Sequence, residues 1–173
     1  DSFEGVTISV PKSIILGTDV FDDFMQENDL AEFALKGLPD EEIGERFLKA
    51  KLPKNILGDL DTFLDIVKYP LAVRSSSMLE DSHLQTFAGI YETHMLPNNH
   101  SSRKTRRQQL EQAIKSVYAS TFFKNARAYH VAAGNRVEEE KMAVIIQQAV
   151  GRNYGKAFYP SFAGVALSYN YYP

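Results

Sequence analysis

The 173-residue sequence contains no cysteine, and this absence alone excludes several kinds of function. It rules out disulfides, thiolate nucleophiles and zinc sites with cysteine ligands. Long apolar runs are also missing, since no stretch approaches the ~18 residues of a membrane-spanning helix. The first residues do not show the pattern of a secretory signal peptide. We therefore expect neither a disulfide-stabilised scaffold nor a membrane-spanning helix.

Several familiar catalytic signatures are absent as well. The sequence has no P-loop, no G-x-S-x-G nucleophile elbow and no G-x-G-x-x-G fingerprint. The histidines do not have the spacing of metal ligands: His83, His94, His100 and His130. The formal net charge of -3 gives no general attraction to nucleic acid or to an anionic membrane surface. A function must therefore be sought in less common combinations of residues.

The composition is that of an ordinary globular protein, with 44% hydrophobic and 24% charged residues. The length suits one domain or two small lobes. The chain begins at Asp1 without a methionine and stops at Pro173, just after a strand-like stretch. We expect it to be a piece excised from a larger multidomain protein, which could supply the rest of a site.

The first part of the chain predicts one strand and then a block of helices. Residues 5–10 alternate apolar and polar side chains, as a half-buried strand does. Residues 18–68 carry apolar side chains at spacings of three and four, which is typical of amphipathic helices. An N-cap, a terminating glycine and two opening prolines mark the expected helix ends: Thr18, Gly37, Pro39 and Pro53.

The second part, residues 69–173, predicts a sheet and one long helix. The expected elements are strands over 69–73 and 86–95, a helix over 103–133, a strand over 141–150 and at least one strand within 157–169. This order favours a mixed α+β fold with a mostly antiparallel sheet rather than a regular βαβ winding.

Arg74 is the first candidate for binding chemistry, because it follows an apolar strand-like run and precedes three serines. A rigid, permanently charged guanidinium at a strand end, next to hydroxyl and backbone N–H donors, suits a phosphate chain. The alternative is a surface arginine that pairs with Glu80 or Asp81. On spacing alone that ion pair is the simpler interpretation.

Three further residues interrupt strand-like runs. Gly89 lies within a predicted strand, where a glycine marks a bulge or a close approach of the backbone to a phosphate or a helix. Gln147 and Gln148 lie inside an otherwise apolar strand, so one of them must point to the buried side. A buried amide needs hydrogen-bond partners, which adenine or a backbone group could supply.

Four basic residues gather in the stretch RKTRR, residues 103–107. They could contact nucleic acid or phosphate, although no aromatic residue is interleaved as in single-strand binders. The alternative, which we prefer, is a solvated helix start. Positive charge at a helix N-terminus is mildly unfavourable, so this interpretation needs compensation from nearby groups.

Taken in order, these segments resemble a known family. The stretch VRSSSMLEDSHLQTFAGIYET resembles the VRSSATAED…SFAGQQ-T signature of the PEP synthase and pyruvate phosphate dikinase family. Looser similarities flank it: ISVPKSIILGTDVFDDFMQEN is similar to VPPGF…T…Y..F, AVIIQQAV to V-Q-x-M-V, and FAGVALS to S-G-V-x-F-T/S. The resemblance covers nearly the whole chain and implies part of an ATP-grasp-like nucleotide-binding domain, also found in rifampin phosphotransferase and glucan water dikinase.

The resemblance implies roles for individual residues. Arg74 would contact ATP phosphate, with Ser75 and Ser76 in the same loop. Gly89 and Thr93 would lie on the strand pair that covers the triphosphate. Gln147 would reach the nucleotide near the hinge between two lobes.

The resemblance also implies an activity for the parent protein, which would be a cytoplasmic, ATP-dependent phosphotransferase of the pyruvate, water dikinase type. The family transfers the β-phosphoryl group of ATP to a histidine of a swivelling domain, releases AMP, and passes the phosphoryl group to pyruvate to make phosphoenolpyruvate. The implied cofactors are ATP and Mg²⁺, with the Mg²⁺ ligands beyond Pro173. The implied partners are the phosphohistidine domain and the PEP/pyruvate domain of the same parent chain. A membrane and nucleic acid are not expected as partners.

The sequence departs from the family pattern at several positions. Met78, Leu79 and Ser82 replace the usual ATAED core, although Glu80 and Asp81 match it. A glycine-rich segment with a phosphate-binding lysine is expected upstream of these 173 residues. The isolated chain is therefore expected to be inactive and to bind nucleotide weakly. The alternative is that the chain is a catalytically degenerate nucleotide-binding module with a regulatory or interaction role.

Overall fold

The structure is a computed structural model, and it describes residues 7–77 and 89–164. Helices occupy much of the described chain: α1 (Thr18–Glu27), α2 (Ala31–Ala34), α3 (Asp40–Lys49), α4 (Lys54–Ile66), α5 (Arg103–Ser120), α6 (Lys124–Ala132) and a 3₁₀ turn η1 (Val137–Glu139). The strands are β1 (Ser13–Leu16), β2 (Leu71–Ser77), β3 (Thr93–Leu96), β4 (Met142–Gln148), β5 (Arg152–Tyr154) and β6 (Ala157–Tyr159). This is the α+β fold with antiparallel sheets that the sequence predicts, and it is consistent with a partial ATP-grasp-like domain.

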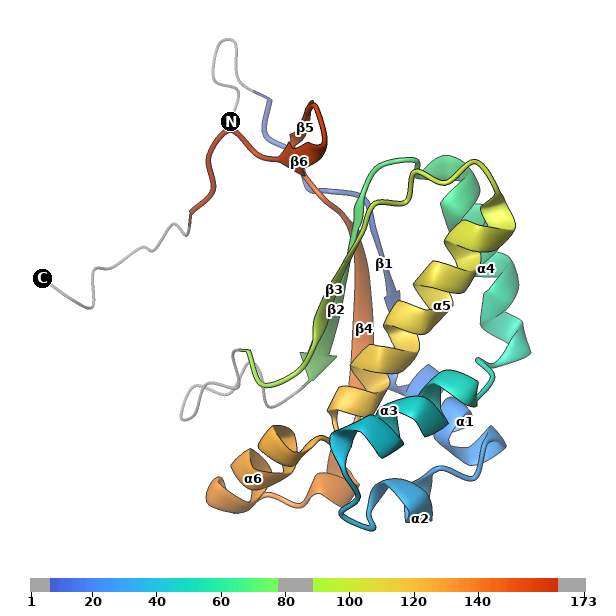
Figure 1. The fold of residues 1–173 in the computed structure, drawn as a ribbon, viewed down its shortest axis with the longest axis vertical. Coiled ribbons are helices and arrows are strands. Elements are labelled where there is room, and N and C mark those ends of the chain that lie inside the picture. The colour runs from blue at the N-terminus through green and yellow to red at the C-terminus, as the bar shows by residue number, and fades with distance from the viewer. Residues whose placement is uncertain (1–6, 78–88, 165–173) are drawn as a thin grey trace, which may run out of the picture.

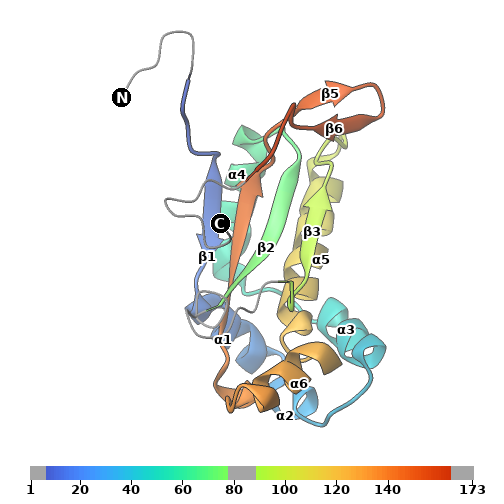
Figure 2. The same cartoon turned by 90° about the vertical axis from the view of Figure 1, so that its left-hand side faces the viewer.

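Four strands form one antiparallel sheet in the order β1-β4-β2-β3, and β5 and β6 form a separate hairpin. Strand β4 is central and pairs along its length with β2, from Leu71 opposite Gln148 to Ser77 opposite Met142. The helices gather on one face of this sheet (Figure 1). In Figure 2, which looks at the other face, α4 and α5 lie behind the strands, α1, α2, α3 and α6 lie at one end of the sheet, and the β5–β6 hairpin lies at the opposite end.

The period of two along each strand divides the sheet into a buried face and an open face. On β2 the side chains of Leu71 and Val73 are fully buried, and on β4 those of Met142, Val144 and Ile146 are buried beside them. These side chains pack on α5, which contacts β2, β3 and β4, and on α1, which contacts β1 and β4. The core therefore lies on the helical side of the sheet and extends between the helices.

Aromatic rings fill the helical layer below the sheet. Phe24 of α1 packs against Phe47 of α3 and against Tyr118 of α5, with ring centroids 5.8 and 5.3 Å apart. Phe21 meets Tyr118 edge-on at 5.1 Å. Such pairs bury large apolar areas and add about 0.5–1.5 kcal/mol each beyond that burial. They fix α1, α3 and α5 as one layer.

The basic stretch 103–107 faces α4 and pairs with its acidic residues. Arg103 binds Asp65 at 2.8 Å, and Arg107 binds Asp61 at 3.1 Å as well as Glu111 of its own helix. These carboxylates supply the compensation that positive charge at the start of α5 requires. The stretch is a helix start, as preferred, but it is not fully solvated, because Arg106 is buried and Arg103 and Arg107 pair with α4.

Arg106 is the one residue of this stretch that is buried. Its Nη1 donates to the carbonyl of Leu64, at 2.8 Å, and to Oδ1 of Asn98, at 3.2 Å. The amide of Asn98 in turn donates to the carbonyls of Val67 and Tyr69, at 3.0 and 2.9 Å. This Arg106–Asn98 network satisfies carbonyls at the C-terminal end of α4 and joins the α4–β2 connection to the β3–α5 loop.

The first predicted strand is wrong. Residues 7–10 lie outside any strand, residues 5 and 6 lie outside the described part, and β1 begins only at Ser13. The alternation over 5–10 is real, but a strand needs a neighbour, and β4 offers pairing only from Ser13, opposite Gln147, onward. The expected N-cap of α1 is also one residue late: Gly17 is the N-cap, and no side chain caps the helix.

The predicted helix over 103–133 breaks in two. Helix α5 ends at Ser120, and Phe123 adopts an extended conformation before α6 begins. The backbone N–H of Lys124 then donates to Oδ1 of Asp40, at 2.7 Å, so a carboxylate from α3 binds the first turn of α6. That partner lies 84 residues away, which is why local periodicity missed the break. The end at Gly134, with φ 73°, is confirmed.

The Arg106–Asn98 network makes a prediction about stability. We expect Arg106→Ala to lower the free energy of unfolding by about 1–3 kcal/mol, because it leaves the buried Oδ1 of Asn98 without a donor. Arg103→Ala is the matched control: it removes the exposed ion pair with Asp65, less than one turn earlier on the same helix, and should change stability by about 0.5 kcal/mol or less. Urea unfolding of both variants measures the difference, and equal effects would contradict the role of Arg106.

Candidate functional site

The open face of the sheet is the candidate site, because no described helix covers it and it carries most of the predicted binding residues (Figure 2). Strand register sets its side chains in rows across the sheet. One row consists of Ile15, Ile145, Arg74 and Thr93, the next consists of Ser13, Gln147, Ala72 and Met95, and a shorter one consists of Ala143 and Ser76. Neighbouring rows lie about 7 Å apart along the strands.

Arg74 occupies the middle of this face. The sequence predicts that the strand ends at this arginine, but β2 continues to Ser77, so that prediction is wrong. The apolar run misplaced the boundary because three serines do not look like strand residues, yet β4 pairs with each of them. Arg74 is exposed, lies between Ile145 and Thr93, and forms no ion pair or side-chain hydrogen bond within residues 7–77 and 89–164. Its alternative partners, Glu80 and Asp81, lie outside the described residues.

Thr93, Ser76 and Gln147 share the face with Arg74. Thr93 lies directly opposite Arg74 on β3, and Ser76 is two positions further along β2. Gln147 lies one row away, opposite Ala72, and is half-buried. Gln148 alternates with Gln147 and so lies on the side of the strand that carries the buried residues Val144 and Ile146. This agrees with the expectation that one of the two glutamines points to the buried side. The structure therefore brings together a cation, two hydroxyls and an amide.

Ser75 and Gly89 do not join this group. Ser75 lies opposite Val144 and has the parity of the buried face. Gly89 lies in a turn before β3, not within a described strand, and has φ 77°, which favours glycine. A Cβ atom placed there would meet nothing within 4 Å, so within the described chain this glycine serves the turn and not a close approach.

Two contacts that the sequence did not indicate hold the start of β3 in place. The hydroxyl of Tyr91 lies 3.1 Å from Nε2 of His130, and the backbone N–H of Glu92 donates to Oγ of Ser120, also at 3.1 Å. Both partners belong to the helical layer. Burial lowers the pKa of His130, so the neutral ring is favoured in the folded protein. These contacts position Thr93, the next residue along the chain.

The open face can bind but offers little chemistry of its own. Its described side chains include no carboxylate, histidine or other ready proton carrier. Within the described ranges no cluster of three histidine, aspartate or glutamate residues could hold a metal ion, so these residues do not fit the implied Mg²⁺. Ile15 and Met95 are 66% and 63% exposed, which leaves apolar surface beside the Arg74 guanidinium. Such a surface suits a ligand with an anionic part and an apolar part.

Comparison with known proteins gives two findings. The family model described as "Pyruvate phosphate dikinase, AMP/ATP-binding domain" matches residues 3–172. A protein of Bacillus subtilis (strain 168), described as "Uncharacterized phosphotransferase YvkC", is 27% identical over 147 residues. That match covers 81% of this chain but only 16% of the relative. In the described part of the chain, no helix is long and apolar enough to cross a membrane.

The division into two faces predicts unequal effects of substitution on stability. Ile146→Ala removes a fully buried side chain and should lower the free energy of unfolding by about 2–5 kcal/mol. Arg74→Ala, on the open face, should change it by about 0.5 kcal/mol or less, because an exposed side chain without a partner is lost. Chemical denaturation compares the two, and a large loss in Arg74→Ala would show that Arg74 is structural.

Buried His130 predicts a pH dependence. Because its pKa is lowered in the folded state, the unfolded chain binds the proton more readily, and stability should fall as pH drops below about 6.5. The slope contributed by one proton is at most about 1.4 kcal/mol per pH unit. Unfolding measured between pH 7.5 and 5 should show this loss, and His130→Gln should reduce the slope. An unchanged slope in that variant would assign the pH dependence to other groups.

Proposed function

Since this chain belongs to the family of pyruvate phosphate dikinase AMP/ATP-binding domains, we propose that the open face of its sheet binds the phosphates of ATP. One observation supports this most strongly: Arg74 is exposed in the middle of the open face and has no partner among the described residues. A guanidinium left without a carboxylate is free to form bidentate hydrogen bonds with a phosphate. Thr93, directly opposite, adds a hydroxyl on the same side.

The other predicted residues differ in how they could contact the ligand. Ser76 shares the face and would bind phosphate oxygen beside Arg74, whereas Gln147, one row away, would reach the nucleoside end of the ligand. Ser75 points to the buried face and Gly89 forms a turn, so any part they have would run through backbone groups. The side chains thus order the ligand along the strands, with phosphates near Arg74 and the nucleoside toward Gln147.

For the parent protein, we propose a dikinase-type phosphoryl transfer, which the family and the phosphotransferase relative support. The β-phosphoryl group of ATP would pass to a histidine on a separate domain of the same chain, with AMP as the leaving group and the γ-phosphoryl group transferred to water, and the histidine would pass its phosphoryl group to pyruvate. In such reactions catalysis is mostly positioning and charge stabilisation, and Arg74 would supply both at the phosphate chain. Mg²⁺ would neutralise phosphate charge, with ligands from outside the described residues.

A second candidate is a nucleotide-binding module that has lost transfer chemistry. The observation in its favour is that the described open face has binding groups but no proton carrier. The two candidates differ in their product, because only a dikinase releases AMP. Both require nucleotide to bind at Arg74.

The test is turnover of ATP to AMP by the full-length protein that contains this chain. We expect AMP to form only when pyruvate is present, and Arg74→Ala to lower the rate by at least about 100-fold, the loss typical of a deleted charge-stabilising group. Arg103→Ala is the matched control, since this arginine pairs with Asp65 in the helical layer and should leave the rate unchanged.

Unchanged turnover in Arg74→Ala would remove this residue from the mechanism. Nucleotide binding that depends on Arg74, without any release of AMP, would instead favour the binding module. Loss of activity in both arginine variants would indicate a general effect on folding.

A further inference from the structure

We propose that a cavity between α3 and α6 binds a small zwitterion, a free α-amino acid, at a site separate from the open face of the sheet. The cavity has a volume of about 360 Å³. This is within the usual range for small-molecule sites, about 300–1,000 Å³. Its lining includes Gly37 and Leu38 of the α2–α3 loop, Asp40 and Glu41 of α3, and Lys124 and Arg127 of α6. Both helices lie at the end of the sheet opposite the β5–β6 hairpin (Figure 2).

Two hydrogen bonds between remote parts of the chain hold the walls of this cavity together. Oδ1 of Asp40 accepts from the backbone N–H of Lys124 at 2.7 Å, across 84 residues of sequence. Nη2 of Arg127 donates to the carbonyl of Leu38 at 3.1 Å, across 89 residues. Each bond uses a backbone group on one side, so it fixes the walls without pairing two opposite side-chain charges. The walls are therefore prearranged before any ligand binds.

Opposite charges line this cavity without neutralising one another. Helix α6 supplies two cations, Lys124 and Arg127, and α3 supplies two carboxylates, Asp40 and Glu41. Within residues 7–77 and 89–164, none of these four side chains forms an ion pair. At the start of α5, by contrast, the arginines bind the carboxylates of α4 directly. A space lined by both signs suits a ligand that carries both charges.

Arg127 has a donor that the described part of the protein does not use. Its Nη1 atom is buried and has no hydrogen-bond partner there, although Nη2 of the same group is bonded. A buried donor left unpaired costs about 1–3 kcal/mol, so this atom gains from an acceptor. Gly37 lies beside it with φ 70°, and an added Cβ would lie 3.7 Å from Nη1. The glycine therefore keeps a side chain away from this donor.

An α-amino acid matches both walls. Its carboxylate would accept from Nη1 of Arg127 and from the ammonium group of Lys124. Its own ammonium group would donate to Glu41 and to the second carboxylate oxygen of Asp40. A ligand with negative charge alone would meet two carboxylates, and a simple cation would meet two basic groups, and such like-charge contacts are unfavourable. The lining therefore favours a zwitterion over either ion.

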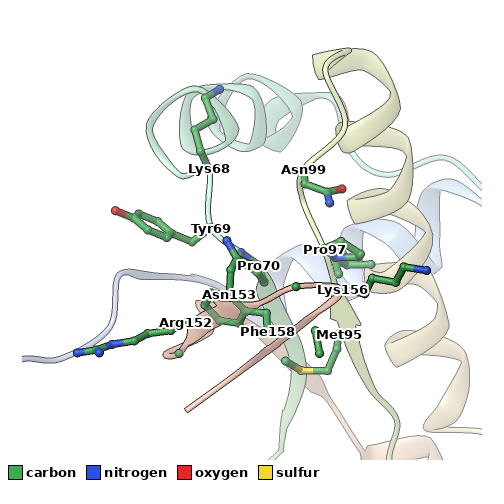
Figure 3. Close-up of a pocket in the computed structure, with 14 residues that line it drawn as sticks. Lys68, Tyr69, Pro70, Met95, Pro97, Asn99, Arg152, Asn153, Lys156 and Phe158 are labelled. Carbon is green, nitrogen blue, oxygen red and sulfur yellow. The ribbon is translucent and has the colours of Figure 1, made fainter. Parts of the chain in front are cut away.

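A larger cavity beneath the β5–β6 hairpin does not offer this combination. It has a volume of about 940 Å³, and its lining includes Lys68, Arg152 and Lys156 (Figure 3). No aspartate or glutamate is among its described lining residues. The described side chains of the open face also include no carboxylate. Binding that depends on Glu41 would therefore distinguish the α3–α6 cavity from both of these regions.

The experiment titrates the full-length protein that contains this chain with each of the standard L-amino acids in calorimetry. We expect at least one to bind, and Glu41→Gln and Lys124→Ala each to weaken it at least about tenfold through loss of one charge-assisted hydrogen bond. Both side chains are exposed, and Lys124→Ala keeps the backbone N–H that binds Asp40. Glu45→Gln on α3 and Arg136→Ala, both off the cavity, are the matched controls and should leave the affinity unchanged.

Two single-charge probes test the choice of a zwitterion. Acetate lacks the ammonium group and methylamine lacks the carboxylate, and neither should displace the amino acid. If acetate competes equally well, the cavity binds an anion and the proposal is wrong.

Other outcomes also overturn the proposal. If no standard amino acid binds, the cavity is not a site for this class of ligand. If one binds but Glu41→Gln and Lys124→Ala leave its affinity unchanged, it binds elsewhere in the full-length protein. Arg74→Ala separates this site from the proposed phosphate site: it should leave the amino acid unaffected, and a loss of affinity would place that ligand on the open face instead.

Discussion

The register of β4 between β1 and β2 is the constraint on which the rest of the structure depends. With Ile146 opposite Val73, every second side chain of the central strands faces α1 and α5, and the remaining ones face away. A slip of one residue would place Arg74 in the core and Val73 outside. The hydrophobic core therefore does more than stabilise the fold. Because alternate strand residues are buried in it, the residues between them, Arg74, Thr93 and Gln147, face the opposite side of the sheet.

The helical layer also shapes the end of the sheet where a nucleoside would lie. The basic start of α5 pairs with Asp61 and Asp65 of α4, and its buried member, Arg106, holds Asn98. Asn98, which lies in the β3–α5 loop, binds the carbonyls of Val67 and Tyr69 and so joins this loop to the α4–β2 connection. A sequence feature that resembles a nucleic-acid patch thus serves the packing of α5 on α4 and the placement of these two connections.

How far the sequence could predict this arrangement depends on the distance between interacting residues. Local patterns located most helices and the central strand, and a family resemblance indicated Arg74, Thr93 and Gln147. Strand β2 continues through three serines, and Ser75 faces the buried side, because β2 pairs with β4. That strand lies about 70 residues away in sequence. Asp40 at the start of α6 and the contact of Tyr91 with His130 are similarly remote. Strand β6 lies within the predicted range 157–169, whereas β5 was not predicted, because its three residues are too few to show a period.

The most direct test of the central claim is an experimental structure of the full-length protein bound to a non-hydrolysable ATP analogue. The account predicts phosphate oxygens within hydrogen-bonding distance of the Arg74 guanidinium on the open face, with Thr93 beside them. A nucleotide bound elsewhere, with Arg74 paired to a carboxylate of the protein instead, would contradict it.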